Sequence, residues 1–164
     1  MKIWQKRVLG ILAIGGGSVG VTAAAMALAL AQAQAQSIFG MFLVLVFVAV
    51  YAWGIWCGLM ILEAAPGAIS QNRIFWAAQI PILASPILTY SFFCAAEAQI
   101  YLRLDSIGGG VYWHIGSLFN FALFKSDKPP MVGINIFALL MFIFLTKLQQ
   151  VANELDPANA AEPL

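Results

Sequence analysis

The chain has 164 residues, of which 62% are hydrophobic and 9% are charged, and its mean hydropathy is +0.89. A soluble domain carries about 25% charged residues, so this composition excludes an ordinary soluble protein. The net charge is +1 and the basic residues are scattered along the chain, which excludes the basic patch of a nucleic-acid-binding protein. We therefore expect an all-α integral membrane protein with no nucleic acid among its partners.

The first apolar run covers residues 8–31 and follows a basic start with Lys2, Lys6 and Arg7. It is long enough to cross a bilayer, which takes about 20 residues. The small residues of the AQAQAQ segment that follows would also suit cleavage of a signal peptide. A signal peptide has a shorter apolar core of about 7 to 15 residues, so we prefer a retained membrane helix.

A second apolar run covers residues 38–62 after a short polar connector, so the first two helices are expected to form an antiparallel hairpin. Small residues recur at helical spacing in both runs. Such residues let helix backbones approach closely in a membrane, and they predict helix packing here, with self-association as the alternative. The residues are Gly16, Gly20, Ala24, Gly54 and Gly58.

Residues 74–102 are long and apolar enough for a third membrane helix, although Pro81 and Pro86 interrupt them. Each proline removes a helix donor, which predicts a kink. The polar residues around this kink, with one from the fourth run, predict a polar pocket: Gln79, Ser85, Thr89, Glu97 and Asn135. Glu97 is the best functional candidate, because an acid costs on the order of 3 kcal/mol at the bilayer centre. The structural alternative is a carboxylate that is solvated at the membrane surface or bonded to Asn135.

Residues 103–130 form a mixed outer loop, and two conformations remain open for it. One is an interfacial helix, and the other is a short β-hairpin that turns at Gly116 and Ser117. The β-branched and aromatic content slightly favours the hairpin. In either conformation the loop predicts a contact surface for a partner, made by Tyr112, Trp113, His114, Phe119 and Phe121.

The predicted architecture is one domain of four transmembrane helices over residues 1–148, with spans at 8–31, 38–62, 74–102 and 131–148. A polar, mobile tail at 149–164 follows it. With both termini in the cytoplasm, most basic residues are inside and fewer are outside, which agrees with the positive-inside rule. The inside set is Lys2, Lys6, Arg7, Arg73 and Lys147, and the outside set is Arg103, Lys125 and Lys128. We expect the location to be the bacterial inner membrane.

The inventory of reactive groups is poor. His114 is the only histidine of the chain, so one copy cannot build a zinc site or a haem held by two histidines. No serine, histidine and acid occur in a recognisable catalytic setting. Cys57 and Cys94 lie in apolar runs, at opposite ends of their predicted spans, so no disulfide is expected. We predict no catalytic residue, no metal and no cofactor.

Two functions of different classes remain. The first is a non-enzymatic protein that binds another membrane or periplasmic protein, as a subunit, an assembly factor or a protective factor. In size and arrangement the predicted bundle is similar to immunity proteins against pore-forming toxins, which is a similarity of topology alone. The alternative is a small oligomeric channel or transporter, in which the polar residues of the broken third helix line a path. A homo-oligomer is compatible with both.

Overall fold

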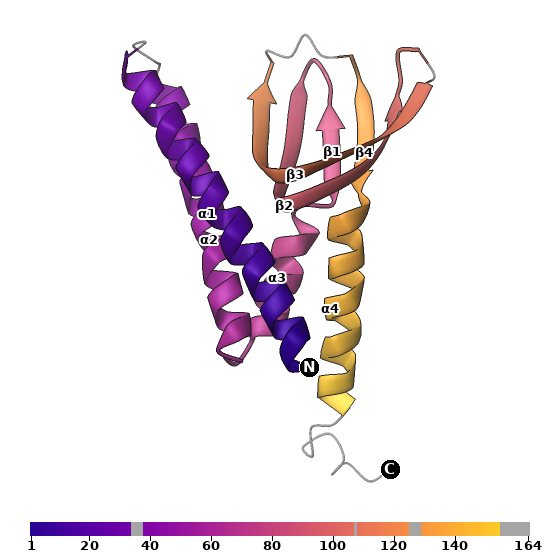
Figure 1. The fold of residues 1–164 in the computed structure, drawn as a ribbon. Coiled ribbons are helices and arrows are strands. Elements are labelled where there is room, and N and C mark those ends of the chain that lie inside the picture. The colour runs from indigo at the N-terminus through magenta and orange to yellow at the C-terminus, as the bar shows by residue number, and fades with distance from the viewer. Residues whose placement is uncertain (34–37, 107, 125–128, 155–164) are drawn as a thin grey trace, which may run out of the picture.

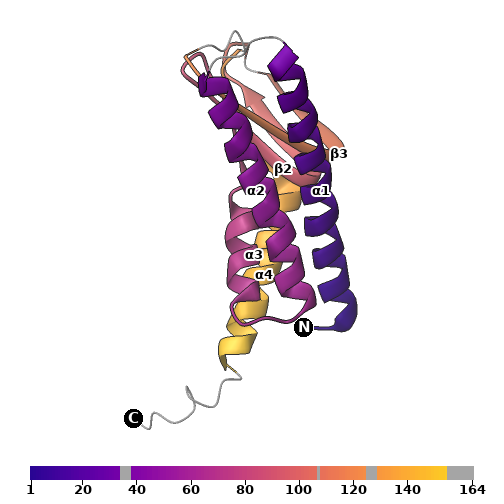
Figure 2. The same cartoon turned by 90° about the vertical axis from the view of Figure 1, so that its left-hand side faces the viewer.

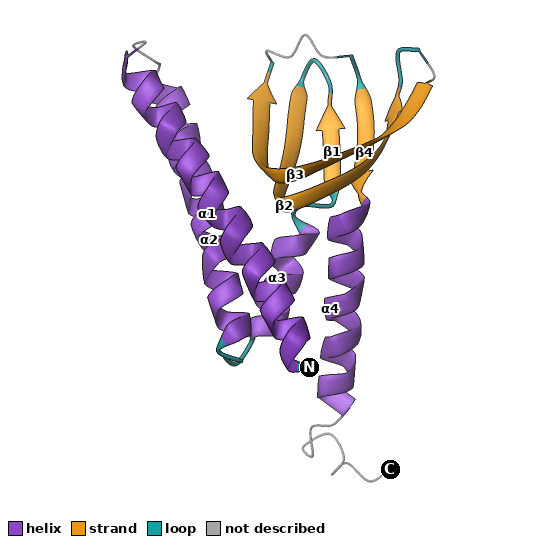
Figure 3. Ribbon diagram, in the orientation of Figure 1, coloured by secondary structure: helices purple, strands orange, loops and turns teal. Residues whose placement is uncertain are grey.

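The computed structural model describes residues 1–33, 38–106, 108–124 and 129–154. Within these residues, four helices and a four-stranded antiparallel sheet follow one another in the order α1, α2, α3, β1, β2, β3, β4, α4. Figure 3 shows that the sheet occupies one end of the molecule, with helices beside it and below it. Three of the helices, α1, α2 and α4, are long and apolar enough to cross a membrane.

Helices α1 (Ile3–Ala33) and α2 (Ile38–Leu62) form the antiparallel hairpin that the two apolar runs predict. Figures 1 and 2 show them side by side along their length. Glycines bring their backbones together: a Cβ on Gly20 would overlap the ring of Tyr51, and a Cβ on Gly58 would overlap Ile14. The packing of this hairpin therefore depends on small side chains at helical spacing.

Helix α3 (Ala68–Ala77) has ten residues and begins after Gly67, whose φ of 76° is in the left-handed region. The buried Asn72 holds it to α2, because its Nδ2 donates hydrogen bonds to the carbonyl oxygens of Cys57 at 2.7 Å and of Ala68 at 2.9 Å. Two tight turns follow α3, and Pro81 then removes the donor that a further helical turn would need. The chain continues as a strand.

The sheet contains two short strands, β1 (Pro81–Ala84) and β4 (Met131–Asn135), and two long ones, β2 (Leu88–Arg103) and β3 (Gly108–Leu123). Strands β2 and β3 have 16 residues each and pair over their full length. The start of β2 also pairs with β1, its end pairs with β4, and β1 pairs with β4. Strands β1, β4 and β2 therefore close a ring, and β3 pairs with the remaining edge of β2.

The long β2–β3 pair is bent into a U, as Figure 1 shows. Ala95 (φ 77°) and Gly116 (φ 146°) lie opposite each other at the bend. Gly116 adopts such an angle freely, whereas Ala95 is strained in it. Ser117 supports the bend, because its Oγ accepts a hydrogen bond from the N–H of Ala95 and donates one to the carbonyl oxygen of Gly16. We call residues 88–94 the first arm of β2 and residues 96–103 its second arm.

Helix α4 (Ile136–Glu154) follows β4 directly and runs back beside α3. Figure 1 shows that the N-terminus and the end of α4 lie at the same end of the molecule, opposite the sheet. The core lies where α2, α3 and the bend of the sheet meet. Phe75, Trp76 and Phe92 are fully buried there, and the ring of Phe75 makes edge contacts with both of the others.

The prediction of an all-α bundle with four membrane helices is wrong. Residues 74–102 form the end of α3, then β1 and most of β2, so the third membrane helix is absent. Pro81 is the first residue of β1 and Pro86 lies in the turn after it, so neither proline kinks a helix. The physical reason is local: two prolines so close together remove helix hydrogen bonds, and β-branched and aromatic residues such as Thr89, Tyr90 and Phe92 suit a strand.

The predictions for the outer loop and the last helix also need correction. Gly116 and Ser117 lie inside the continuous strand β3 and form no hairpin turn, and the described part of residues 103–130 contains no interfacial helix. Residues 107 and 125–128 lie outside the described residues. The fourth run begins as strand β4 and becomes helical at Ile136, and this helix includes residues 149–154 of the predicted tail. With three candidate spans instead of four, the topological similarity to immunity proteins loses its basis.

Candidate functional site

One face of the bent sheet is covered in the first arm and bare in the second. In the first arm, Phe92 packs against Tyr51 of α2 with ring centroids 5.7 Å apart. On the adjacent strand β3, Phe119 packs against Phe47 of α2 at 4.2 Å. Since side chains alternate between the two faces of a strand, the same face continues past the bend into Ile100 and Leu102, which are exposed. We call this face the outer face.

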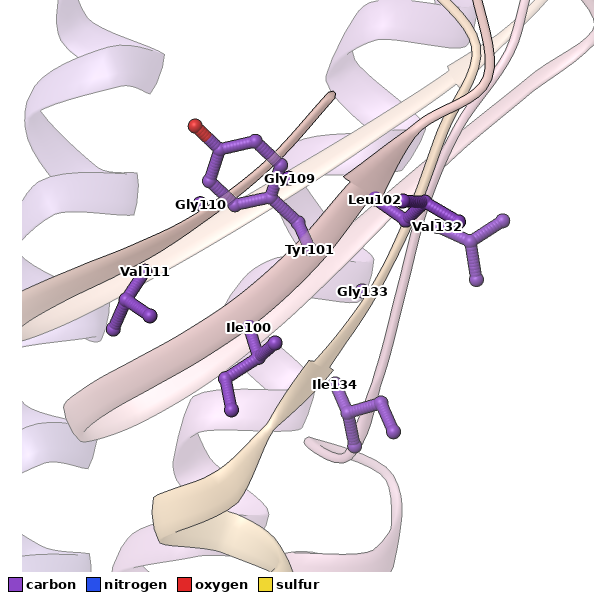
Figure 4. Close-up of a pocket in the computed structure, with 9 residues that line it drawn as sticks. All are labelled: Ile100, Tyr101, Leu102, Gly109, Gly110, Val111, Val132, Gly133 and Ile134. Atoms are coloured by element: carbon purple, nitrogen blue, oxygen red, sulfur yellow. The ribbon is translucent and has the colours of Figure 1, made fainter. Parts of the chain in front are cut away.

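The bare part of the outer face holds an open groove of about 660 Å³ that crosses three adjacent strands. Figure 4 shows its lining: Ile100, Tyr101, Leu102, Gly109, Gly110, Val111, Val132, Gly133 and Ile134. The sheet register places Ile100 between Val111 of β3 and Ile134 of β4, and Leu102 beside Val132. The groove is apolar because the side chains that line it on the outer face of the sheet are aliphatic. We call it the apolar groove.

Two glycines of the groove, Gly110 and Gly133, leave room for side chains on the inner face of the sheet. A Cβ on Gly110 would overlap the hydroxyl of Tyr101, and a Cβ on Gly133 would come within 3.0 Å of Nε2 of Gln99. Both conflicts involve side chains on the opposite face of the sheet. Because these positions are glycines, the side chains of Tyr101 and Gln99 can lie over the neighbouring strands on the inner face.

The second feature of this region is the free edge of β3. In the described chain, β3 pairs with β2 alone. The N–H of Ala98 points toward the β4 side, because it donates to Oδ1 of Asn135 at 3.2 Å. In an antiparallel ladder, two residues directly opposite either bond to each other or both point away. Trp113, which is opposite Ala98, therefore directs its N–H to the free edge, as do Val111 and Ile115.

The inner face of the sheet carries polar residues. Glu97 is 5% exposed, Gln99 is 8% exposed and Asn135 is fully buried. Across the ladder, Glu97 is opposite His114, whose ring stacks on Tyr112 with 7° between the planes.

Two buried amides connect the sheet to the helices below it. The Gln79 Oε1 accepts a hydrogen bond from the N–H of Cys94 at 2.8 Å, and its Nε2 donates to the carbonyl oxygen of Phe75 at 3.2 Å. Besides Ala98, Oδ1 of Asn135 accepts from the N–H groups of Phe137 and Ala138 at the start of α4. Both amides satisfy backbone groups where a strand and a helix meet.

The structure divides the predicted polar pocket. Gln79, Glu97 and Asn135 lie near the base of the sheet, whereas Ser85 lies in the turn between β1 and β2 and bonds there to both backbone groups of Leu88. Thr89 follows this turn and is buried. No described cavity joins the five residues, and the pocket remains a prediction without support from their placement.

The predicted packing residues all lie at close contacts, but with different neighbours. Gly20 and Gly58 pack one helix on the other, whereas Gly54 faces the ring of Phe75 in α3. Gly16 faces the backbone of Cys94 and Ala95 at the bend of the sheet. Ala24 is buried in α1.

The predicted contact surface of the outer loop is also divided. Tyr112, Trp113 and His114 are exposed on β3, whereas Phe119 and Phe121 are half-buried. Sequence reasoning missed the aliphatic residues of the groove. The signal for them is the alternation in residues 97–102, where Glu97 and Gln99 alternate with Ala98, Ile100 and Leu102.

The remaining chemistry is sparse. In the parts of the chain that the structure describes, no three His, Cys, Asp or Glu side chains gather as metal ligands. Cys57 and Cys94 are free and buried, and Cys94 lies beside Ala13 in the middle of α1, not at the outer end of a span. Comparison of the chain with protein-family models, curated proteins and solved structures found no match.

Proposed function

We propose that this chain is a membrane protein that acts by binding another polypeptide and has no catalytic role. The observation that carries the proposal is the free edge of β3 over residues 108–115, which a strand of a partner can extend. An unpaired strand edge presents a row of backbone donors and acceptors, and many binding proteins use such an edge to add a strand from a partner.

The chemistry of the edge specifies the kind of partner. Beside the free N–H groups stand Val111, Trp113 and Ile115, which are 78%, 72% and 75% exposed. A partner strand with polar side chains would offer these three residues no apolar contacts. The partner is therefore an apolar, extended segment of another membrane polypeptide, such as a subunit or an assembly partner, or a second copy of this chain.

The contacts of the reactive side chains support a binding role over catalysis. Ser117 donates its hydroxyl proton to the carbonyl oxygen of Gly16 at 2.6 Å, so it serves the bend of the sheet. The thiol of Cys94 lies 3.8 Å from the carbonyl oxygen of Ala13. Gln79 and Asn135 bond to backbone groups. The channel alternative depends on a broken third helix, and the structure has the strands β1 and β2 in its place.

The three apolar helices suit insertion into a membrane. We propose the bacterial inner membrane, with both termini in the cytoplasm. The support is the common position of both chain ends in Figure 1 and the basic residues near that end, Lys2, Lys6, Arg7 and Lys147. The sheet then projects toward the periplasmic side.

Photo-crosslinking tests strand addition. A photoreactive amino acid replaces Trp113 in one variant and Ile115 in another, and the crosslinked residue of the partner is identified by mass spectrometry. Since both positions lie on the same strand, moving the photoreactive group by two residues should move the crosslink by two residues along one extended segment of the partner. Crosslinks without such a register would contradict strand addition.

A matched pair of substitutions tests the backbone directly. Val111→Pro removes an N–H that points to the free edge, whereas Val111→Ala shortens the side chain and keeps the N–H. We expect the proline variant to lose the crosslink and the alanine variant to retain most of it. The fully buried Trp76 is the position for a negative control. Equal crosslinking in both Val111 variants would refute the proposal.

A further inference from the structure

The outer face of the sheet reverses the pattern of a soluble protein. In the second arm, Ile100 and Leu102 point outward and are exposed, while Glu97 and Gln99 point inward and are buried. A sheet in water places its apolar residues inside. Apolar residues outside and polar residues inside are the pattern of strands that face lipid.

The helices set the level of the membrane. At the end of the molecule opposite the sheet, Arg7 of α1, Glu63 just after α2 and Lys147 of α4 each lie about one turn or less from contacts that join the helices. Leu62 meets Gly10 of α1, and Phe144, one turn before Lys147, lines a small cleft with Val8. Charged groups at one level mark one boundary of the hydrocarbon core.

All 19 residues of α4 together are long enough for a span, but the part of α4 above Lys147 is too short to cross the core from this boundary. From Lys147 to the start of α4 at Ile136 the helix measures about 17 Å at about 1.5 Å per residue, whereas the hydrocarbon core is about 30 Å thick. The 25 residues of α2 measure about 37 Å by the same rise. The core therefore extends beyond the top of α4, to the level where Figure 1 shows the sheet beside α1 and α2.

The position of the bend gives the same depth. Gly16 lies against the backbone of Cys94 and Ala95 at the base of the sheet. From Arg7 to Gly16, α1 rises about 14 Å, or less if it is tilted, so the base of the sheet is near the middle of the core. The tip of the β2–β3 pair lies at the far end, where Arg103 and Asp105 form an exposed ion pair at 3.2 Å.

The backbone of β2 is suited to this depth. Within hydrocarbon, a backbone group without a partner costs several kcal/mol, so strands must be paired on both sides. Strand β2 meets this condition, since it pairs with β3 along one edge and with β1 and β4 along the other. Strand β4 also meets it, since it pairs with β1 and β2. Among the described strands β3 pairs with β2 alone, so at this depth its free edge requires the partner strand of the proposed function.

We infer that the outer face of the second arm, including the apolar groove, contacts the acyl chains of the bilayer. The lipid-facing surface of the helices continues onto this face. The inner face, with Tyr112 and His114 beside the buried Glu97, is turned away from lipid toward water, because ionisable groups at membrane depth face polar cavities. For β3 this inference rests on the proposed function, because a partner strand has to pair its free edge at membrane depth, whereas Ile100, Leu102 and Ile134 lie on strands that are paired on both sides.

Nitroxide accessibility tests the inference. Single cysteines replace residues 111–115 one at a time, carry a spin label, and are measured in vesicles of phosphatidylethanolamine and phosphatidylglycerol. Collision with oxygen, which dissolves in hydrocarbon, should be several-fold higher at 111, 113 and 115 than at 112 and 114. Collision with a water-soluble nickel chelate should show the opposite alternation. Ser106→Cys at the exposed tip is the water control, and the wild-type chain, whose Cys57 and Cys94 are fully buried, gives the background.

Ile134→Cys on β4 tests the same face from another strand, so a variant of β3 that fails to fold does not decide the outcome. Access of the nickel chelate to positions 111, 113 and 134 would mean that the outer face is in water, which overturns the inference. Immobilised labels that neither reagent reaches would mean that protein covers the face, which also overturns it. Spin–spin broadening in that case would identify a second copy. The crosslinks at the edge of β3 are read independently of these collisions.

Discussion

Asn135 is the residue on which the junction of sheet and helix depends. Its Oδ1 accepts hydrogen bonds from Ala98 of β2 and from Phe137 and Ala138 of α4, at 3.2, 3.1 and 3.4 Å. An asparagine before a helix satisfies first-turn N–H groups that have no partner inside the helix. Here the same oxygen also binds a strand, so one side chain ends β4, begins α4 and fixes β2.

We therefore predict that Asn135→Ala destabilises the fold by about 1–3 kcal/mol, since three N–H groups, of Ala98, Phe137 and Ala138, lose their acceptor. Thermal unfolding in detergent, followed by circular dichroism, measures the loss. Asn135→Ser is the control, because serine keeps a capping oxygen and should lose less. Equal stability of the alanine variant and the wild-type chain would mean that water replaces this acceptor without cost.

Glu97 gives a prediction about pH. Its side chain is 5% exposed, and burying an ionised carboxylate costs more free energy than burying a protonated one.

Glu97→Gln keeps the size of the side chain and removes the titration. We predict that this variant matches the wild-type chain in stability at pH 4 and exceeds it at pH 8, as measured by thermal unfolding at both values. Glu63→Gln, at an exposed position after α2, should show no such difference. A variant of Glu97 that is less stable than the wild-type chain at pH 8 would show that the carboxylate makes a favourable contact in the folded state.

At the scale of elements, α1 approaches the bend of the sheet closely at Gly16. A Cβ on Gly16 would overlap the backbone N of Ala95 and the side chain of Cys94. The neighbouring Gly15 has nothing within 4 Å of its Cβ position. Two adjacent glycines on one helix therefore offer a matched comparison.

We predict that Gly16→Ala destabilises the fold by about 1–3 kcal/mol, because a strand backbone cannot move aside as a flexible side chain can. Gly15→Ala should be neutral or stabilising by up to about 1 kcal/mol, since alanine favours the helix. Unfolding of both variants under the same detergent conditions measures the difference. If the two variants lose equal stability, the close approach at Gly16 is not a constraint.

The elements also show what the sequence could predict. The first two helices follow from their uninterrupted apolar runs, and the predicted spans 8–31 and 38–62 lie within α1 and α2. The error over residues 74–102 has a physical origin. In the first arm of β2 both faces are covered, so Phe92 and Phe93 are adjacent and both buried, and the alternation that marks a strand is lost.

The ring of β1, β4 and β2 was beyond prediction for a different reason. It joins Ile82 to Gly133 and Ile100 to Ile134, which lie far apart along the chain. Hydrophobic periodicity reports on the neighbours of a residue along one element, not on which elements pair. The sequence predicts Trp113 as a contact residue of the outer loop, whereas the apolar groove exists only because β2, β3 and β4 come together.

At the scale of the whole molecule, the chain rises through α1, descends through α2, rises again through α3 and the sheet, and descends through α4, as Figure 1 shows. With the sheet at the depth inferred above, α3 and the sheet provide a third crossing and β4 with α4 provides a fourth, as a pair of membrane helices does in a bundle. The chain can therefore keep both ends at one side although three of its helices are long enough to cross a membrane.

This path predicts the sides from which three positions react in sealed vesicles. Lys2→Cys and Gln150→Cys, at the two described ends, should react with a membrane-impermeant maleimide from the same side. Ser106→Cys, at the tip of the sheet, should react from the opposite side, because α1 and α2 place the full hydrocarbon thickness between them. The buried Cys57 and Cys94 should not react in any variant. Reaction of residues 2 and 150 from opposite sides would mean that α4 crosses the membrane by itself, which would overturn both this path and the depth inferred for the sheet.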